Sequence, residues 1–299
     1  MTVLLPAIIP VAFIIIIGVI AGKTLSLEKQ TLSQLIVYIL APALIADSLY
    51  TTTISAENAT RLLLGVFIVA FILFLLVYLI SYILKFPPIT RKSLIATSLH
   101  PNTGNMGLPL VDFALGEEGL QRAIIYLIGS SILLFGIAPA ILAGTSLKHS
   151  LKVTFKLPLM WAILAGLTLR FFQIKLPFNL GEALHILGRA AIPVALIILG
   201  MELVKTKFKV TKFELISLNF RLVLAPLISL LIGTIIQLPP LDLQVFILQS
   251  AMPTAVNTIV LAAEFGGEST KVARTIVVTT LLSFLTLPLV LWVADNVNY

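Results

Sequence analysis

The stretch of sequence that decides the fold runs Ser98-Leu99-His100-Pro101-Asn102-Thr103-Gly104-Asn105-Met106-Gly107-Leu108-Pro109. It carries two prolines, two glycines and two asparagines in the middle of an apolar region. Each proline removes a backbone donor, and each glycine lowers the cost of irregular backbone, so a continuous helix is not expected here. Inside a membrane, the freed backbone groups must be buried in protein or line a wet cavity. The stretch therefore predicts a broken membrane helix beside a polar site.

The composition of the chain indicates that its solvent is the lipid bilayer. Of 299 residues, 59% are apolar and 11% are charged, whereas soluble domains average about 25% charged residues. The apolar residues are contiguous, and about 20 of them in a helix cross the hydrocarbon core. We therefore predict an all-α, multi-pass protein of the cell membrane. The net charge of +7 is spread over short loops, so nucleic acid is not expected as a partner.

Hydrophobic runs bounded by charge, proline or glycine predict ten membrane spans. Lysine and arginine are concentrated in alternate loops, which places those loops in the cytoplasm and both termini outside. The approximate centres of the predicted spans are Ile14, Ile39, Leu73, Asn105, Leu133, Leu164, Ala195, Leu227, Val256 and Phe284.

The two halves of the chain, 1–147 and 148–299, share a register of polar and proline residues. An offset of 152 positions relates Pro101 to Pro253 and Asn105 to Asn257. Because five spans is an odd number, the second half is expected to lie inverted relative to the first. In secondary transporters with inverted repeats, the substrate site lies where corresponding broken helices meet. The same offset relates Asp112 to Glu264, Phe113 to Phe265, Arg122 to Arg274 and Ser131 to Ser283.

The ninth predicted span repeats the break as Met252-Pro253-Thr254-Ala255-Val256-Asn257-Thr258. A break leaves a half-helix whose free N–H groups attract anions, and asparagine and threonine add neutral donors beside it. A kink without a ligand is the alternative for any single proline. We expect the substrate-binding residues to be Pro101, Asn102, Thr103, Gly104, Asn105, Pro253, Val256, Asn257 and Thr258.

Ionisable residues inside membrane spans are costly and are candidates for coupling or for a charge network. The candidates are Asp47, His100, Asp112, Arg221 and Glu264. A structural or interfacial role is the alternative for the three acids. For Arg221 we expect an ion pair with a buried carboxylate first and anion contact second, and for His100 either proton coupling or a hydrogen bond to a freed carbonyl. With no cysteine and three scattered histidines, neither a metal nor another cofactor is expected.

These motifs resemble the auxin efflux carrier superfamily, which includes plant auxin carriers and bacterial carriers of malonate or malate. The resemblance is carried by Pro101-Asn102-Thr103, Met106-Gly107 and Pro109, and by Met252-Pro253 with Ala263-Glu264-Phe265. It implies a fold like that of sodium/proton antiporters and bile acid transporters, in which broken helices 4 and 9 cross. It also implies a homodimer, a scaffold of helices 1, 2, 6 and 7, and a transport bundle of helices 3–5 and 8–10.

The resemblance further implies that Asn102 contacts a substrate carboxylate. The short connection at 148–156 and the additional Asn105 and Asn257 depart from the plant carriers, and they favour a small organic anion other than auxin.

The function expected from the sequence is secondary active transport or uniport of a small organic anion by an elevator-type mechanism. The alternatives are a sodium- or proton-coupled symporter of another solute, or a channel, because broken helices also build pores. An enzyme is not expected, because the chain carries no H-E-x-x-H, G-x-S-x-G or aspartate-rich motif.

Overall fold

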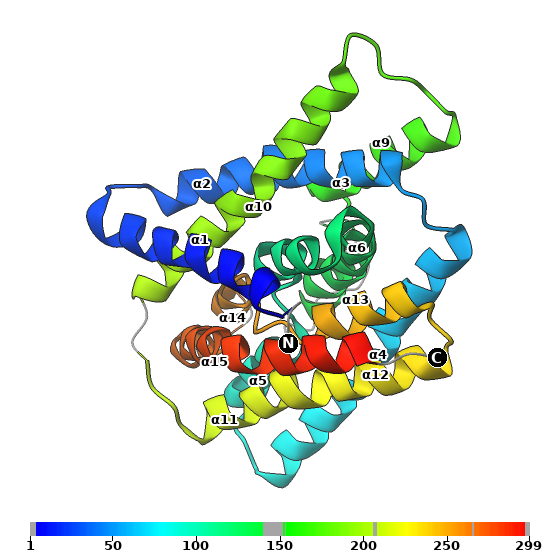
Figure 1. The fold of residues 1–299 in the computed structure, drawn as a ribbon. Coiled ribbons are helices and arrows are strands. Elements are labelled where there is room, and N and C mark those ends of the chain that lie inside the picture. Colours follow the sequence, from blue (N-terminus) through cyan, green and yellow to red (C-terminus); the bar gives the residue numbers. More distant parts are fainter. Residues whose placement is uncertain (1–3, 140–151, 153, 206–207, 265, 297–299) are drawn as a thin grey trace.

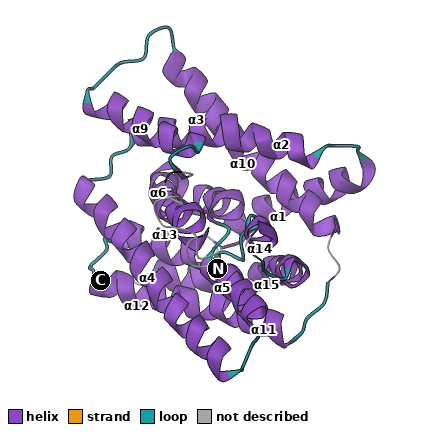
Figure 2. Ribbon diagram, turned by 180° about the vertical axis from the view of Figure 1, so that it is seen from behind, coloured by secondary structure: helices purple, strands orange, loops and turns teal. Residues whose placement is uncertain are grey.

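The computed structural model describes residues 4–139, 152, 154–205, 208–264 and 266–296, and this part is helical throughout (Figures 1 and 2). Most of the predicted connection 148–156, and Phe265, lie outside it. The elements are α1 (Leu4–Thr24), α2 (Lys29–Leu35), η1 (Ile36–Leu40), α3 (Ala41–Thr51), α4 (Ala56–Ile83), α5 (Pro88–Leu99), η2 (Thr103–Gly107), α6 (Leu108–Ser131), η3 (Ile132–Ile137), α9 (Pro158–Phe171), α10 (Leu180–Lys205), α11 (Lys212–Leu218), η4 (Asn219–Leu224), α12 (Ala225–Ile235), α13 (Pro240–Ser250), α14 (Thr258–Glu264) and α15 (Ser269–Asn296).

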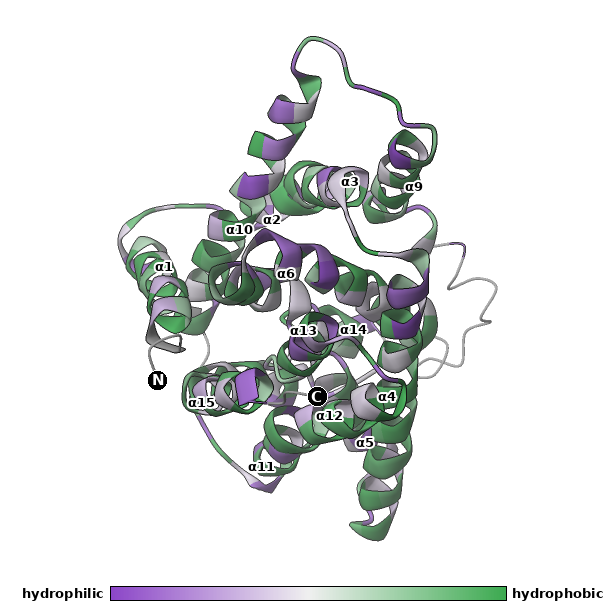
Figure 3. Ribbon diagram, turned by 45° about the vertical axis from the view of Figure 1, so that its right-hand side comes forward, coloured by the Kyte–Doolittle hydropathy of each residue, from purple (hydrophilic) through white to green (hydrophobic). Residues whose placement is uncertain are grey.

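Within the described residues, seven helices are long and apolar enough to cross a membrane. Many large apolar side chains on them are exposed, such as Phe13, Phe71 and Leu285, and Figure 3 shows that α1 and α4 are rich in hydrophobic residues. Such surfaces are expected to contact lipid. The chain is therefore a multi-pass, all-helical membrane protein, as the composition predicts.

The predicted fourth and ninth spans are each divided between shorter helices. The region of the fourth span contains α5, η2 and the start of α6, and that of the ninth contains α13 and α14. Within α6 the backbone at Gly116 is non-helical, with φ 66° and ψ −164°, a conformation that only glycine adopts at low cost. This kink separates residues 108–115 from residues 117–131, so the fourth and fifth predicted spans meet at Gly116.

Four π-helical segments, η1 to η4, have a common cause in the sequence. Each ends two residues before a proline, which is Pro42, Pro139, Pro226 or, for the segment inside the broken helix, Pro109. A proline ring clashes with the carbonyl four residues earlier and offers no N–H, so the preceding turn widens. Asn105 lies in one of these widened turns, η2.

We call α1, α2, η1, α3, α9 and α10 the first helical group. In it α1 packs along α10, and α3 packs against α9 and α10, as Figure 1 shows at the top of the view. Glycines bring these backbones together, because a Cβ added at Gly18 or Gly200 would lie closer than 3.0 Å to the facing helix, at Ile197 and Ile15 respectively. Close backbone contact through small residues is the usual way in which membrane helices associate.

The remaining helices, α4 to α6 with η2 and η3 and α11 to α15 with η4, form the second helical group. Its interior has a hydrophobic core and also contains buried polar side chains, among them the completely buried Thr97, Ser217 and Thr279. The Thr97 and Ser217 hydroxyls, from α5 and α11, are hydrogen-bonded at 2.8 Å. Membrane helices use such bonds as interhelical contacts.

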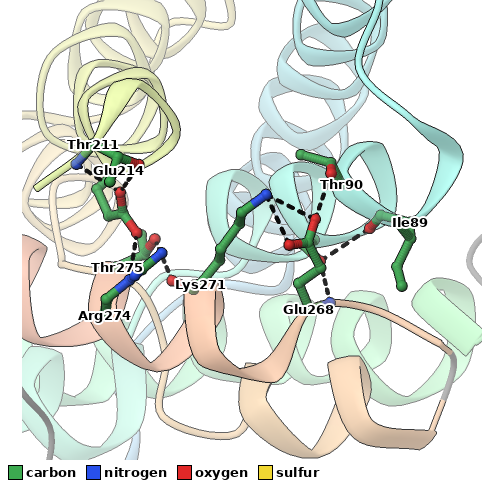
Figure 4. A network of polar contacts seen from close by, with 9 residues as sticks. Ile89, Thr90, Thr211, Glu214, Glu268, Lys271, Arg274 and Thr275 are labelled. Carbon is green, nitrogen blue, oxygen red and sulfur yellow. Dashed lines mark hydrogen bonds and ion pairs between the residues drawn. The ribbon is translucent and has the colours of Figure 1, made fainter. Parts of the chain in front are cut away.

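A polar network joins α5, α11 and α15 at one end of the second helical group (Figure 4). The Arg274 guanidinium of α15 donates to the buried Glu214 carboxylate of α11 at 2.9 Å. Glu268 accepts hydrogen bonds from Thr90 of α5 and from Lys271. Burial raises the pKa of Glu268, but the hydrogen bonds from Lys271 and Thr90 outweigh it, so the pKa lies below its usual value of 4.5. The network therefore stabilises the ionised carboxylate of Glu268.

Candidate functional site

The breaks in the two interrupted helices lie against each other. Pro101 and Thr254 form an antiparallel β-bridge, and the Asn102 N–H donates to the Pro253 carbonyl at 2.7 Å. Each break therefore supplies partners for backbone groups that the other releases. The structure thus brings together the two proline motifs that the sequence relates by the 152-residue offset.

Further bonds hold the paired breaks inside the second helical group. The Ala255 N–H donates to the His100 carbonyl at 2.9 Å. The Thr254 hydroxyl donates to the Thr97 carbonyl at 2.9 Å, and the Thr254 N–H donates to the Thr279 hydroxyl at 3.1 Å. Irregular backbone is tolerated at membrane depth only with such partners.

Arg221 lies beneath the breaks and is 1% exposed. Its guanidinium donates to the carbonyls of Ser98 at the end of α5 and of Ser250 and Met252 at the end of α13. The expectation of an ion pair with a carboxylate is therefore wrong for Arg221. The physical reason is that two helix C-termini converge on it, and their unpaired carbonyls are good acceptors for a guanidinium.

The candidate acids of the sequence have other partners. Asp47 contacts His185 of α10 at 2.8 Å, and Asp112 contacts Arg189 of α10 at 2.7 Å. Glu264 is exposed at the end of α14. These acids are spread over different contacts and do not meet at the paired breaks.

Two completely buried acids, Asp242 and Glu214, were not among the sequence candidates. Arg122 donates to Asp242 at 2.5 Å, and Arg274 donates to Glu214 at 2.9 Å. Arg122 and Arg274 are related by the 152-residue offset, so that offset was the available signal. Both acids lie in the first turn of a helix.

A cavity of about 150 Å³ lies between the two helical groups. Asn105 and Gly104 of η2 and Asn257, which precedes α14, line it from one side. Pro42 and other apolar residues of the first helical group, including Ala191, Ile192 and Ala195 of α10, line it from the other. The cavity therefore has an apolar wall and a wall that carries the amides of both broken helices.

Of the predicted substrate-binding residues, Gly104, Asn105 and Asn257 line this cavity, and the others do not. Val256 packs partly buried against the core. The remaining five residues are buried behind the cavity wall, in or beside the paired breaks and at the start of α14. They are Pro101, Asn102, Thr103, Pro253 and Thr258.

Asn102 is 3% exposed, and its side-chain Nδ2 has no hydrogen-bond partner in the described residues. The same is true of both amide atoms of Gln249 in α13. Gln249 packs directly over Gly107, where an added Cβ would lie closer than 3.0 Å to the Gln249 amide. Gln249 was missed from the sequence, although a glutamine in an apolar helix of the ninth span was a usable signal.

The two alternatives for the His100 side chain, proton coupling and a hydrogen bond to a freed carbonyl, stay predictions. The His100 carbonyl accepts from Ala255, but its Nδ1 has no hydrogen-bond partner in the described residues. The ring lines a separate apolar cavity of about 380 Å³ with Phe67, Phe71 and Phe74. The structure therefore separates His100 from the cavity that Asn105 and Asn257 line.

In the part of the chain that the structure describes, no three His, Asp or Glu side chains lie close enough to hold a metal ion. The polar side chains that line the cavity are the neutral amides of Asn105 and Asn257. Chemically, this set can donate hydrogen bonds to an anion or a neutral solute, and it offers no group for acid–base or covalent catalysis.

The chain is similar to known membrane transporters. A family described as "Membrane transport protein" matches residues 3–144 and 142–291. An uncharacterised transporter of Methanocaldococcus jannaschii is 29% identical over 96% of this chain and 98% of its own length. A Rhizobium meliloti protein named "Putative malonate transporter" is 24% identical over 85% of this chain and 83% of its own length. An uncharacterised transporter of Methanothermobacter thermautotrophicus is 27% identical over 88% of both chains. The chain therefore belongs to the membrane transport protein family, that of the auxin efflux carriers, as its proline motifs indicate.

Proposed function

We propose that the protein is a secondary active transporter or uniporter of a small organic anion, which binds in the cavity between the two helical groups. The observation that carries the proposal is that Asn105 and Asn257, from two different broken helices, line one cavity. Neutral amide donors and the first N–H groups of a helix suit a carboxylate. No acidic side chain lines this cavity in the described residues, so an anion meets no direct repulsion there.

We propose a small carboxylate of the malonate or malate type as the substrate. Support comes from the name of the Rhizobium relative and from the modest cavity volume of about 150 Å³. Apart from the amides, the walls are aliphatic or aromatic, which suits the carbon skeleton of the substrate. Indole-acetate, with a larger aromatic body, is the second candidate that the family resemblance implies.

The proposed architecture is ten spans in two inverted five-span repeats, with both termini outside and broken helices 4 and 9 crossing at the paired breaks. The first helical group then serves as the scaffold and the second as the moving transport bundle, within a homodimer. Glycine-mediated packing inside the first helical group supports this division. So do the hydrogen bonds that tie both breaks to the second helical group.

The proposed orientation also suggests which side of the membrane the cavity faces. Phe135, Leu157 and Leu159 form part of its lining, and Leu157 directly follows the lysine-bearing segment that the charge distribution places in the cytoplasm. The ion pair of Arg189 with Asp112 joins the two groups. We therefore assign this arrangement to an inward-facing state of an elevator-type cycle.

The test is uptake of labelled malonate, malate and indole-acetate into proteoliposomes, with and without an imposed pH gradient. Asn105→Ala and Asn257→Ala should each lower uptake at least about tenfold, since each removes a donor to a charged group. Asn296→Ala, at an exposed position of α15, is the matched control and should retain uptake. Asn102→Ala tests the role that the family resemblance implies for Asn102.

Three outcomes separate the alternatives. Absence of carboxylate uptake by folded protein would rule out the organic-anion class and point to another solute. Uptake driven by a sodium or proton gradient would establish a symporter, and gradient-independent conductance at channel rates would establish a pore. Unchanged uptake in both Asn105→Ala and Asn257→Ala would remove the cavity as the binding site.

A further inference from the structure

We infer that Arg221 sets the charge preference of the transport site without touching the substrate, by neutralising the two helix C-termini at the paired breaks. The inference rests on the proposed function, and it adds a specificity-determining residue in η4. Arg221 is thus a positioning and electrostatic residue, and its effect on affinity should grow with the negative charge of the substrate.

The contacts of Arg221 define its electrostatic role. Its guanidinium donates to the carbonyls of Ser98, Ser250 and Met252, where α5 and α13 end. A helix C-terminus carries roughly −0.5 elementary charge. Two such ends together amount to about −1, which one guanidinium offsets. The balance explains how a cation that is 1% exposed is stable without a carboxylate beside it.

Other buried charges in the described residues are balanced differently. Asp242 is paired with Arg122, and Glu214 is paired with Arg274. At Arg221 the opposing charge comes from the backbone dipoles of two helices and not from an acidic side chain. If Arg221 were neutral, the two helix C-termini would place about one elementary negative charge next to the site. That charge would repel an anion.

Arg221 is close enough to the cavity for this effect to be measurable. The extended segment of three residues from His100 to Asn102 links the end of α5, which Arg221 contacts, to η2, which lines the cavity. Three extended residues span about 10 Å. At that separation and an effective dielectric constant of about 20, one unit charge changes binding roughly 10- to 20-fold.

The experiment compares malonate, a dianion at neutral pH, with its half-amide malonamate, a monoanion of similar shape. Both compete with labelled malonate for the full-length protein in lipid nanodiscs. Arg221→Gln keeps hydrogen-bond donors and loses the charge. It should weaken the binding of malonate at least about tenfold more than the binding of malonamate. Arg221→Lys, which keeps the charge, should leave the ratio of the two affinities within about threefold of the wild-type ratio.

A second pair of variants leaves Arg221 in place. The Ser98 carbonyl accepts from Arg221, and the Ser98 hydroxyl is buried without a hydrogen-bond partner in the described residues. Ser98→Asp puts a carboxylate next to the guanidinium, whereas Ser98→Asn has nearly the same shape and no charge. The Asp variant should lower the malonate-to-malonamate preference as Arg221→Gln does, and the Asn variant should preserve it.

The outcomes are separable. Equal losses for both acids in Arg221→Gln and in Ser98→Asp would mean that Arg221 is only structural, and they would overturn the inference. If Arg221→Gln does not give monodisperse protein, the Ser98 pair decides. If the wild type binds neither acid, the proposed function fails first, and the inference falls with it.

Discussion

The two helical groups differ in their closest helix contacts, although ion pairs join helices in both, such as Asp47 with His185 in the first helical group. In the first helical group, Gly18 and Gly200 allow the backbones of α1 and α10 to touch. In the second helical group, buried hydroxyls and charges such as Arg221 and Asp242 make hydrogen bonds across helices. Lipid offers no hydrogen bonds, so a group that contains broken helices needs polar partners of its own. The comparison teaches that the paired breaks and the polar side chains that support them belong to the second helical group, which is the group that the proposed function treats as mobile.

The largest expected effect is a loss of stability in the second helical group. Arg122→Gln would leave the completely buried Asp242 carboxylate without its partner, which costs about 3–5 kcal/mol. The double variant Arg122→Gln with Asp242→Asn removes both charges of the pair, so it should recover much of the lost stability. Unfolding followed in detergent measures it, with Glu57→Gln as the control, because the pair of Arg61 with the exposed Glu57 contributes at most about 1 kcal/mol. If Arg122→Gln and the control Glu57→Gln destabilised the protein equally, the comparison would be contradicted.

The next largest effect is a loss of stability in the first helical group, caused by a steric clash alone. A Cβ at Gly200 would collide with the Ile15 backbone of α1, so Gly200→Ala should cost about 1–3 kcal/mol through displacement of α1 from α10. Gly181→Ala in the same helix is the matched control, because nothing lies within 4 Å of its added Cβ. The midpoint of thermal unfolding reports the difference. If the two alanine variants unfold together, close packing of α1 on α10 is not what holds the first helical group.

A smaller effect concerns the contact between the groups. Arg189→Gln removes the ion pair of Arg189 with Asp112, which at this exposure contributes about 0.2–1 kcal/mol. Since 1.4 kcal/mol is tenfold, the population of the outward-facing state should rise about 1.4- to fivefold. The chain has no cysteine, so Asn105→Cys provides a single label. Labelling by an impermeant maleimide from the outer side should speed up in Arg189→Gln and stay unchanged in Arg189→Lys.

The smallest effect sharpens the comparison at the end of the second helical group. The pKa of Glu268 is lowered in the folded protein, so its ionised form stabilises the fold. That contribution is fully present above the usual pKa of 4.5 and is lost as the pH falls through the lowered folded pKa. Glu268→Gln should therefore destabilise by less than about 1 kcal/mol at pH 7, and the difference from wild type should vanish in acid. A difference that grows as the pH falls would reverse the assignment.

Several features of the site could be predicted from sequence because they follow from local chemistry. Pro101 and Pro253 forbid a regular helix wherever the chain places them, and their common offset, shared by Asn105 and Asn257, predicted that the breaks correspond. The structure places both asparagines at one cavity. The offset carried no information on depth, so it could not separate Asn105, which lines the cavity, from Asn102, which lies behind it.

The contacts of Arg221 show what sequence reasoning could not reach. An arginine in a membrane span was expected to find a carboxylate, because that is the commonest way to compensate a buried charge. Its acceptors are instead carbonyls 123 and 29 residues away, and they are available only because α5 and α13 end there. Gln249 was missed for a related reason, since its position over Gly107 depends on how α13 packs on η2.

The amino-acid sequence by itself determined that this chain is a multi-pass helical membrane protein with two interrupted helices, because hydropathy and proline act through local backbone chemistry. Only the tertiary structure decided which polar groups meet. It paired the two breaks through Asn102 and Pro253, turned Asn105 and Asn257 toward one cavity, and directed two helix ends at Arg221. The physical reason is that backbone groups released at membrane depth must find partners, and those partners come from parts of the chain far apart in sequence.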